Sequence, residues 1–268
     1  MGQIAAHFAM TEVIRRASEH GIAAAAVRGS NHCGTMAYYA TMVLDHDMIG
    51  LATTNALPTM APWGGAERLL GINPLGVAIP AGEEEPIVYD AAFSGSSHGK
   101  IRIHAQKGLP LPDGWALDRE GRPTTDPTIA IEGLLMPIGG FKGTGLALVT
   151  GVLSSMLSGA SYGTELGNMG DGPEAGQDGH FLVAIRVDAF EDAERFKQRI
   201  DGAILEIRSS RRAKGVERIY TPGELEHLRR EEYEAQGIPL NSQTLVDFAA
   251  AAESVGVSTD DYTWLEGA

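Results

Sequence analysis

The stretch that decides the fold runs from Ile22 to Leu44 and reads IAAAAVRGSNHCGTMAYYATMVL. The apolar run Ile22–Val27 predicts a β-strand, and the run Thr35–Leu44 predicts a helix. Between them, Ser30-Asn31-His32-Cys33-Gly34 forms a turn of small residues around one imidazole. A junction from strand to helix exposes backbone N–H groups, which favour negative charge. His32 in such a turn can move a proton near neutral pH, and the alternative is a histidine that only satisfies its loop.

On both sides of this stretch, segments of helical period alternate irregularly with short apolar strands. Strands are expected at Met48–Thr53, Leu75–Pro80, Ile87–Tyr89 and His180–Val187, and helices at 3–19, Leu146–Leu157, Glu191–Arg208, Glu224–Gln236 and from Asn241 or Ser242 to Val255. The helix Leu146–Leu157 carries an apolar stripe at Leu146, Val149, Leu153 and Met156, while 109–127 and 158–179 read as loops. The short strand spacing predicts an α/β fold of the α+β type, with a mixed or antiparallel sheet and flanking helices.

Composition narrows the class of protein. Glycine accounts for 34 of 268 residues, above the usual level of about 7 %, which indicates tight turns and close approaches of backbone to ligand. The net charge of −14 and the pI near 4.9 argue against a protein that binds nucleic acid or anionic membranes. A single cysteine, Cys33, excludes an intrachain disulfide and suits a reducing compartment. No apolar run approaches about 18 residues, so we expect a cytoplasmic protein without a membrane span.

A second glycine-rich turn, Gly139-Gly140-Phe141-Lys142-Gly143-Thr144-Gly145, leads directly into the predicted helix Leu146–Leu157. Free N–H groups at that end can receive an anion, and Lys142 adds a positive charge. A lysine is normally unfavourable at the N-terminus of a helix, so its presence favours a phosphate or carboxylate ligand. The alternative is a solvated lysine on a turn.

The common short functional motifs identify no binding or catalytic site in this sequence. No Walker loop is present, and the glycines of 170–175 follow no strand and open no helix, so they do not make a dinucleotide fingerprint. His98 and His104 are close in sequence but lack the spacing of zinc ligands, and no pair of cysteines exists. We expect no metal site. A zinc hydrolase that uses His32, His98 and His104 is retained only as a further alternative.

Several segments, taken in order along nearly the whole chain, resemble the non-Rossmann malate/L-lactate dehydrogenase family. Relatives within that family include ureidoglycolate and sulfolactate dehydrogenases, 2,3-diketogulonate reductase and Δ1-piperideine-2-carboxylate reductase. The matching segments are Ser30-Asn31-His32-Cys33-Gly34, Asn55 to Gly65, Gly71-Ile72-Asn73-Pro74, Asp90-Ala91-Ala92, Gly114-Trp115-Ala116-Leu117-Asp118, Gly139-Gly140-Phe141-Lys142-Gly143, Ser158-Gly159-Ala160, Pro222-Gly223-Glu224 and Gly237-Ile238-Pro239-Leu240.

This resemblance implies an NAD- or NADP-dependent oxidoreductase that transfers a hydride between a nicotinamide cofactor and a 2-hydroxy or 2-keto acid, or a cyclic imino acid. It also implies a small-molecule substrate and a homodimer. We expect residues 1–45 to belong to a catalytic and dimer part, 46–190 to form a cofactor-binding domain, and 191–268 to form a C-terminal helical part that packs back on the first. Whether the cofactor is NAD or NADP stays open, as does the substrate.

The resemblance also implies roles for individual residues. His32 corresponds to the residue proposed as the proton acceptor in some members. Cofactor contacts are implied for His32, Cys33, Gly34, Thr35, Met36, Asn55, Ala56, Asp90, Ala91, Ala92, Lys142, Gly223 and Glu224, and substrate contacts for His98 and Gly99.

Two departures from the family's pattern affect the catalytic half. The sequence holds no N-terminal Asp-Ser-His-Gly type of motif with its neighbouring arginine, and Ile72 stands where the family usually has threonine. The loss of an acid and of a carboxylate-binding arginine weakens proton transfer and substrate binding. The chain is therefore expected to be an N-terminally shortened enzyme, and the alternative is a catalytically silent homologue that still binds a dinucleotide.

Overall fold

The computed structural model describes residues 1–167 and 176–258. The chain divides into two compact units, Met1–Gly223 and Glu224–Ala268. The first unit contains both sheets and the helices that pack on them. The three-part division expected from the sequence stays a prediction.

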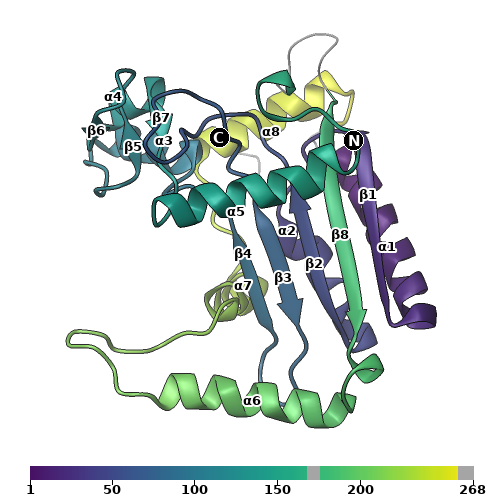
Figure 1. Cartoon of the computed structure of the whole chain (residues 1–268). Helices are drawn as coiled ribbons and strands as arrows, with labels where there is room; N and C mark the ends of the chain where they lie inside the picture. The colour runs from purple at the N-terminus through teal and green to yellow at the C-terminus, as the bar shows by residue number, and fades with distance from the viewer. Residues whose placement is uncertain (168–175, 259–268) are drawn as a thin grey trace. The chain divides into compact units, whose positions relative to one another are not determined.

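The first unit is built around a five-stranded sheet whose neighbouring strands all pair antiparallel (Figure 1). In spatial order its strands are β1 (Ile22–Ser30), β8 (Asp178–Arg186), β2 (Met48–Thr54), β3 (Leu75–Ile79) and β4 (Ile87–Ala91). All five coincide with strands expected from the sequence, and the α+β class with an antiparallel sheet is confirmed.

The register brings several strand termini to one end of this sheet. Ser30 at the end of β1 lies opposite Asp178 at the start of β8, and Thr54 at the end of β2 lies opposite His180. Leu75 at the start of β3 pairs with Ala91 at the end of β4. We call this the site end of the sheet, because the turns that follow β1, β2 and β4 all leave from it.

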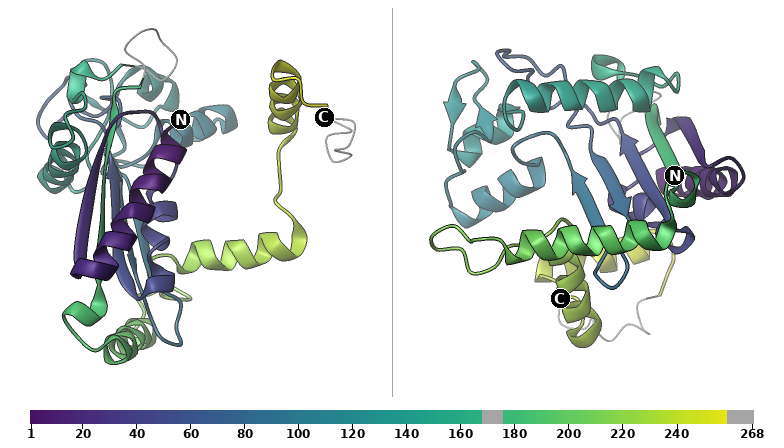
Figure 2. Two further views of the ribbon diagram at one scale, coloured as in Figure 1. Left: turned by 90° about the vertical axis from the view of Figure 1, so that its right-hand side faces the viewer. Right: turned by 60° about the horizontal axis from the view of Figure 1, so that its bottom comes forward.

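Two helices, α1 (Gly2–His20) and α2 (Met36–Thr41), cover one face of the large sheet (Figure 2). Met10, Val13, Met36, Tyr39 and Leu182 are buried in the core between them and the strands. Helix α2 is shorter than the helix expected over Thr35–Leu44, and the 3-10 turn η1 (Leu44–His46) follows it. A Cβ at Gly50 would lie 2.3 Å from the Ala40 carbonyl oxygen, so only glycine lets α2 pack this closely on β2.

The segment 109–127 is not the loop with few core residues that the sequence suggested. It contributes β5 (Ala116–Leu117) and β6 (Pro123–Thr124), which with β7 (Leu134–Leu135) form a small antiparallel sheet in the order β6-β5-β7. Two further helices, α3 (His98–Lys107) and α4 (Pro127–Glu132), pack beside it. Buried apolar residues of this part form a second core: Met60, Leu70, Phe93, Ile101, Leu111, Ala116, Ala130, Leu135 and Ala147.

Helix α5 (Phe141–Gly151) continues as a π-helical turn, η2 (Val152–Met156). It begins on the side of the small sheet and crosses the site end of the large sheet toward β8 (Figure 1). The apolar stripe of this helix does not form its buried face, because Leu146, Val149 and Met156 are 46 %, 57 % and 54 % exposed. Small residues face the core instead, among them Ala147 and Thr150, because α5 lies too close to the sheet for larger side chains.

The remaining elements follow the sequence closely. Helix α6 (Ala193–Ser209), helix α7 (Glu224–Gln236) and helix α8 (Ser242–Ser254) occur where helices were expected, and the Asn241 side chain caps α8 by accepting from the Thr244 N–H. Short 3-10 turns are η3 (Gly163–Glu165) and η5 (Val187–Ala189). The loop expected over 158–179 falls partly on 168–175, outside the described residues, as do the glycines of 170–175. Within the described part of the chain, none of the helices has the length and apolarity to cross a bilayer.

Candidate functional site

A cavity of about 190 Å³ opens at the site end of the large sheet. Its polar lining comes from the turns after β1 and β2 and from the start of β8, and its apolar lining comes from the chain before β3 and after η3. The lining residues are His32, Cys33, Gly34, Thr54, Asn55, Ala56, Leu57, Ile72, Pro74, Leu166, Gly167 and Asp178. Five of the residues predicted as cofactor contacts therefore meet in one place: His32, Cys33, Gly34, Asn55 and Ala56.

The exposed imidazole of His32 is held by its own turn. The backbone N–H of Gly34 donates to Nδ1 at 3.1 Å, so the neutral ring carries its proton on Nε2. Gly34 has a φ of 86°, a conformation that residues with a Cβ rarely adopt, and its Cα faces open space. The turn thus presents one ring nitrogen and an unobstructed stretch of backbone to the cavity.

A half-buried carboxylate, Asp178, lines the same cavity as His32. Burial raises the pKa of Asp178 from its ordinary value, and the charge of the nearby His32 opposes this change. Asp178 was not predicted as a site residue, because 158–179 reads as a loop in the sequence. The available signal was the run Asp178-Gly179-His180 at the start of a strand.

The wall formed by Asn55 and Ala56 is preorganised by hydrogen bonds. The Asn55 side chain donates to the Ser161 carbonyl at 2.8 Å and accepts from the Gly179 N–H at 2.9 Å. The Ala56 N–H donates to Oδ1 of buried Asn73 at 2.9 Å. The polar atoms that fix this wall are bonded within the protein, so the wall offers a ligand shape rather than free side-chain donors.

Asp90 lies at the end of β4, across from the start of α2. Its carboxylate accepts from the Thr35 hydroxyl and from the Ala37 N–H, the latter at 2.7 Å. A carboxylate in this position stabilises the exposed N-terminus of α2. Asp90, Ala91 and Ala92 are thereby joined to the Thr35–Met36 segment, although none of these residues lines the cavity.

Gly223 lies along the outer edge of β4. Its neighbour Pro222 accepts a hydrogen bond from the Val88 N–H at 3.0 Å, and a Cβ at Gly223 would lie 2.8 Å from Cβ of Val88. Glu224 is the first residue of α7 and begins the second unit.

Lys142, His98 and Gly99 do not line the cavity. Lys142 is in the first turn of α5, at the end of that helix on the side of the small sheet (Figure 1). His98 and Gly99 open α3, and burial lowers the pKa of His98, with smaller contributions from the charges of Arg68 and Arg102. These predicted contacts therefore belong to a different part of the first unit from His32.

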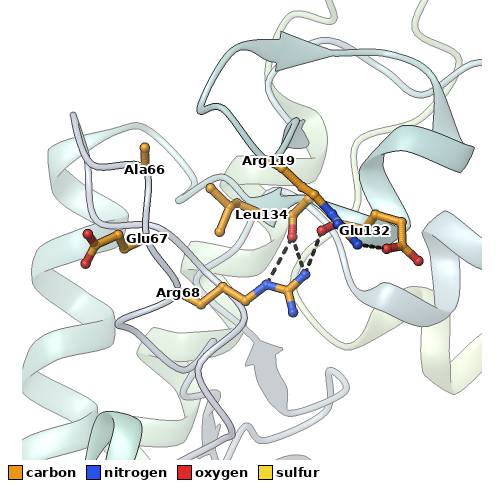
Figure 3. A pocket seen from close by; sticks show the side chains of 7 residues that line it. Ala66, Glu67, Arg68, Arg119, Glu132 and Leu134 are labelled. Atoms are coloured by element: carbon orange, nitrogen blue, oxygen red, sulfur yellow. Dashed lines mark hydrogen bonds and ion pairs between the residues drawn. The ribbon is translucent and has the colours of Figure 1, made fainter.

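A second hollow, of about 360 Å³, lies beside the small sheet (Figure 3). Its Arg68 guanidinium donates to the carbonyls of Glu132 and Gly133, and Arg119 pairs with the Glu132 carboxylate. Both cations thus have partners within the hollow itself. The His32 cavity, which combines an imidazole, a carboxylate and apolar walls, is the better candidate for chemistry.

His104, the third histidine of the zinc alternative, lies beside the small sheet. Its Nδ1 is 2.9 Å from the Pro110 carbonyl oxygen, and its ring packs edge-on against Trp115. Among residues 1–167 and 176–258, no three His, Cys, Asp or Glu side chains are grouped so that they would hold a metal ion.

Comparison with known proteins agrees with this geometry. Residues 1–248 match the profile of the family described as malate/L-lactate dehydrogenase. The chain belongs to that family. It is 35 % identical to the L-sulfolactate dehydrogenase of Methanocaldococcus jannaschii over 98 % of this chain and 75 % of that protein. It is 37 % identical to the malate dehydrogenase of Pyrococcus horikoshii over 96 % of this chain and 73 % of that protein.

Solved structures of this malate/L-lactate dehydrogenase family superpose on most of the chain. The sulfolactate dehydrogenase of M. jannaschii gives a TM-score of 0.90 over 97 % of this chain and 75 % of that one, at 35 % identity. The Δ1-piperideine-2-carboxylate reductase of Pseudomonas syringae gives 0.78 over 90 % and 71 %, at 29 % identity. The names of two relatives state the cofactor. One is a ureidoglycolate dehydrogenase (NAD(+)) of Escherichia coli, which is 32 % identical over 89 % of this chain and 68 % of that protein. The other is a (2R)-3-sulfolactate dehydrogenase (NADP(+)) of Chromohalobacter salexigens, which is 35 % identical over 83 % of this chain and 65 % of that protein.

Proposed function

We propose that this chain is an NAD- or NADP-dependent oxidoreductase that transfers a hydride between the nicotinamide and C2 of a 2-hydroxy acid or 2-keto acid, or of a cyclic imino acid. The observation that carries this proposal is the placement of His32 and Asp178 on one cavity of the malate/L-lactate dehydrogenase fold. A reaction at C2 needs one group that exchanges a proton with the substrate heteroatom, and an imidazole next to a carboxylate can do this near neutral pH.

The residues around the cavity fit a nicotinamide ring. Ile72, Pro74 and Leu166 supply apolar walls, and the open backbone at Gly34 leaves room where a side chain would otherwise project. When bound, the cofactor supplies the hydride chemistry at C2. We assign cofactor contacts to His32, Cys33, Gly34, Asn55 and Ala56, which line the cavity. Further cofactor contacts, outside the lining of the cavity, are assigned to Thr35, Met36, Asp90, Ala91, Ala92, Lys142, Gly223 and Glu224, and substrate contacts to His98 and Gly99.

His32 takes the role of proton acceptor during oxidation and of proton donor during reduction. Its Nδ1 accepts from the Gly34 N–H, so the neutral ring points Nε2–H away from the turn. The imidazolium carries protons on both nitrogens and cannot accept from Gly34. Nε2 can therefore accept a substrate proton only in the tautomer that carries its proton on Nδ1, which has lost the Gly34 bond. When the resulting imidazolium gives its Nε2 proton back to a substrate, the ring returns to that same Nδ1–H tautomer.

We also propose that the chain acts as a homodimer in the cytoplasm. An apolar groove of about 760 Å³ adjoins the cavity and shares Cys33 and Gly34 with it. Two side chains on α1 that line this groove, Ile4 and Phe8, are 63 % and 68 % exposed. Exposed apolar side chains grouped in this way favour a protein contact. Analytical ultracentrifugation over a range of protein concentrations tests the dimer.

The function is tested by following NADH and NADPH oxidation with pyruvate, oxaloacetate, sulfopyruvate and Δ1-piperideine-2-carboxylate. We expect turnover of at least one of them, and a fall in kcat of about 10²-fold or more for His32→Ala with cofactor binding retained. His46→Ala, a histidine of η1 that does not line the cavity, serves as the matched control. An unchanged kcat for His32→Ala would remove this imidazole from the mechanism.

The silent-homologue alternative is not adopted, since the relatives that share most of this chain are named as enzymes. The same assay addresses it, because cofactor binding without turnover of any substrate would favour it.

A further inference from the structure

One buried imidazole, His180, is not used by the proposed chemistry. It lies on β8 and is 1 % exposed. Its Nε2 is 2.8 Å from the Ser30 hydroxyl on β1, and its Nδ1 is 2.8 Å from the Thr54 hydroxyl on β2. The side chain therefore joins three neighbouring strands at the site end of the sheet.

The partners of His180 favour one tautomer of its ring. The Thr54 hydroxyl has one proton, and its oxygen lies 3.1 Å from the carbonyl oxygens of Gly179 and Asn55, to which it donates. Donation by Thr54 to these carbonyls favours the tautomer in which Nδ1 carries the ring proton, facing the Thr54 oxygen at 2.8 Å and Cys33 Sγ at 3.7 Å, while Nε2 accepts from the Ser30 hydroxyl. Every polar atom of the ring is satisfied in the neutral form.

Both partners directly precede the segments that line the cavity. Ser30 ends β1 and is followed by the turn that holds His32, while Thr54 ends β2 and is followed by Asn55. On β8 itself, Asp178 comes two residues before His180. One ring thus sets the relative positions of the proton-exchanging side chain, the cofactor wall and the carboxylate.

We propose that His180 is a positioning residue of the active site, which aligns His32 through Ser30 and the Asn55–Ala56 wall through Thr54. This inference rests on the proposed function. Burial lowers the pKa of His180 to about 4, so this ring stays neutral near neutral pH. A buried histidine that only fills the core would stabilise the fold, but loss of its two partners would not change kcat and the KM for cofactor separately.

The hydrogen bond of His180 to Ser30 and its hydrogen bond to Thr54 predict different kinetic changes. Ser30→Ala removes the bond that leads to His32, and we expect kcat to fall roughly tenfold with the KM for cofactor within about twofold of wild type. Thr54→Val keeps the side-chain volume but removes the other bond, and we expect the KM for cofactor to rise roughly tenfold with a smaller change in kcat.

Further variants make the test specific. His180→Gln is expected to show both effects, and Ser30→Ala added to it should lower kcat no further, because the two residues act through one bond. Ser155→Ala is the matched control: its hydroxyl is equally buried and donates to the Gly151 carbonyl within its own helix. We expect the control to lower the melting temperature without changing kcat or KM.

Three results would each overturn the inference. The first is that Ser30→Ala and Thr54→Val change kcat and KM equally. The second is additive losses in the Ser30→Ala/His180→Gln pair, and the third is unchanged kinetics in all variants. A readout without activity separates it from the proposed function. In ¹⁵N NMR we expect a slowly exchanging Nδ1–H on His180, with the Gly34 amide shifting in Ser30→Ala and the Ala56 amide shifting in Thr54→Val. The opposite tautomer, or amide shifts that do not follow the two hydrogen bonds, would reject the inference even if the enzyme were active.

Discussion

His32 and Gly34 are the smallest part of the proposed site. The Gly34 N–H lies 3.1 Å from Nδ1 of the imidazole, and the φ of 86° at Gly34 is what brings that N–H back toward the ring. Backbone conformation, rather than a second side chain, therefore selects the neutral tautomer. In the proposed proton exchange the glycine therefore matters as much as the histidine.

The first prediction concerns Gly34→Ala. A Cβ at positive φ costs about 1 kcal/mol of folding free energy, and the strain acts on the bond to His32. Gly215→Ala is the control, since Gly215 has a φ of 82° and also faces open space. We expect both variants to lose similar stability in urea unfolding but only Gly34→Ala to lose kcat, by roughly tenfold. Equal kcat values in the two variants would contradict a role for this turn in proton exchange.

The second prediction concerns pH and His180. Burial lowers the pKa of this ring from 6.5 to about 4 in the folded state. Between these values the unfolded chain binds a proton that the folded chain excludes, so stability falls as pH decreases from 6.5 to 4. The loss reaches roughly 3 kcal/mol of unfolding free energy. Calorimetry across this range should show a shallower decline for His180→Gln, and parallel curves for the two proteins would contradict the assignment.

At the scale of elements, carboxylates attach helices to the large sheet at both of its ends. Asp90 accepts from the N-terminus of α2 near the site end. Asp201 on α6 accepts from three successive N–H groups of the β3–β4 turn, those of Gly82, Glu83 and Glu84 at 2.9, 2.9 and 3.2 Å. Desolvation raises the pKa of Asp201, but the three backbone hydrogen bonds together outweigh this effect, so the pKa is lowered from its ordinary value.

The third prediction is that Asp201→Asn destabilises the protein by about 1 kcal/mol or more, because an amide can accept only part of this charge-assisted bonding. Glu194→Gln on the same helix breaks an exposed pair with Lys197 and should cost about 0–1 kcal/mol. Since the folded pKa of Asp201 is depressed, its contribution is present above 3.8 and is lost as pH falls through the folded value. Urea unfolding at neutral pH compares the two variants, and a larger loss for Glu194→Gln would contradict the role of this carboxylate.

The fourth prediction concerns the two faces of α5. A Cβ at Gly151 would lie 2.5 Å from Nδ2 of Asn73 and 2.8 Å from Cε2 of Tyr162, so Gly151→Ala should cost about 1–3 kcal/mol through overpacking. Val149, 57 % exposed, projects away from the sheet, and Val149→Ala should change the unfolding free energy by about 0.5 kcal/mol or less. Thermal unfolding ranks the two, and the reverse order would mean that the expected apolar stripe is buried after all.

The same elements show what the sequence could predict. Strands β1, β2 and β8 were found because their apolar runs lie between turns, and α6, α7 and α8 because their charge patterns and caps are local signals. Helix α5 was found but its buried face was not, since periodicity assumes that the core takes large side chains. The small sheet was missed because its strands are only two residues long and carry no period.

Some residues of the candidate site could likewise be predicted from the sequence, and others could not. The turn around His32 is a local feature that sequence reasoning could find. Asp178 and His180 become part of the site only through the pairing of β8 with β1 and β2, which joins residues about half the chain apart. Lys142 was grouped with His32 by charge and glycine content, and nothing local could indicate that its place on α5 lies outside the lining of the cavity.

For the whole molecule, a net charge of −14 sets the long-range field that a dinucleotide meets. Such a charge repels an anionic ligand at low ionic strength, and the repulsion is screened beyond about 10 Å at 0.1 M salt. Binding must therefore depend on short-range contacts, of the kind that the preformed walls of the His32 cavity provide.

The fifth prediction follows for cofactor binding. A ligand that binds only the folded state adds about 2.7 kcal/mol to the unfolding free energy at a hundred times its Kd, which raises the melting temperature by roughly 5 °C or more. We expect NADH or NADPH to produce this shift, and the one that produces the larger shift identifies the preferred cofactor. His32→Ala should keep the shift while losing turnover, because the ring exchanges protons whereas the apolar walls and backbone hold the cofactor. Thr54→Val should reduce the shift, since it releases the Asn55–Ala56 wall. An unchanged melting temperature with both dinucleotides at millimolar concentration would contradict cofactor binding, whatever the kinetics of individual variants.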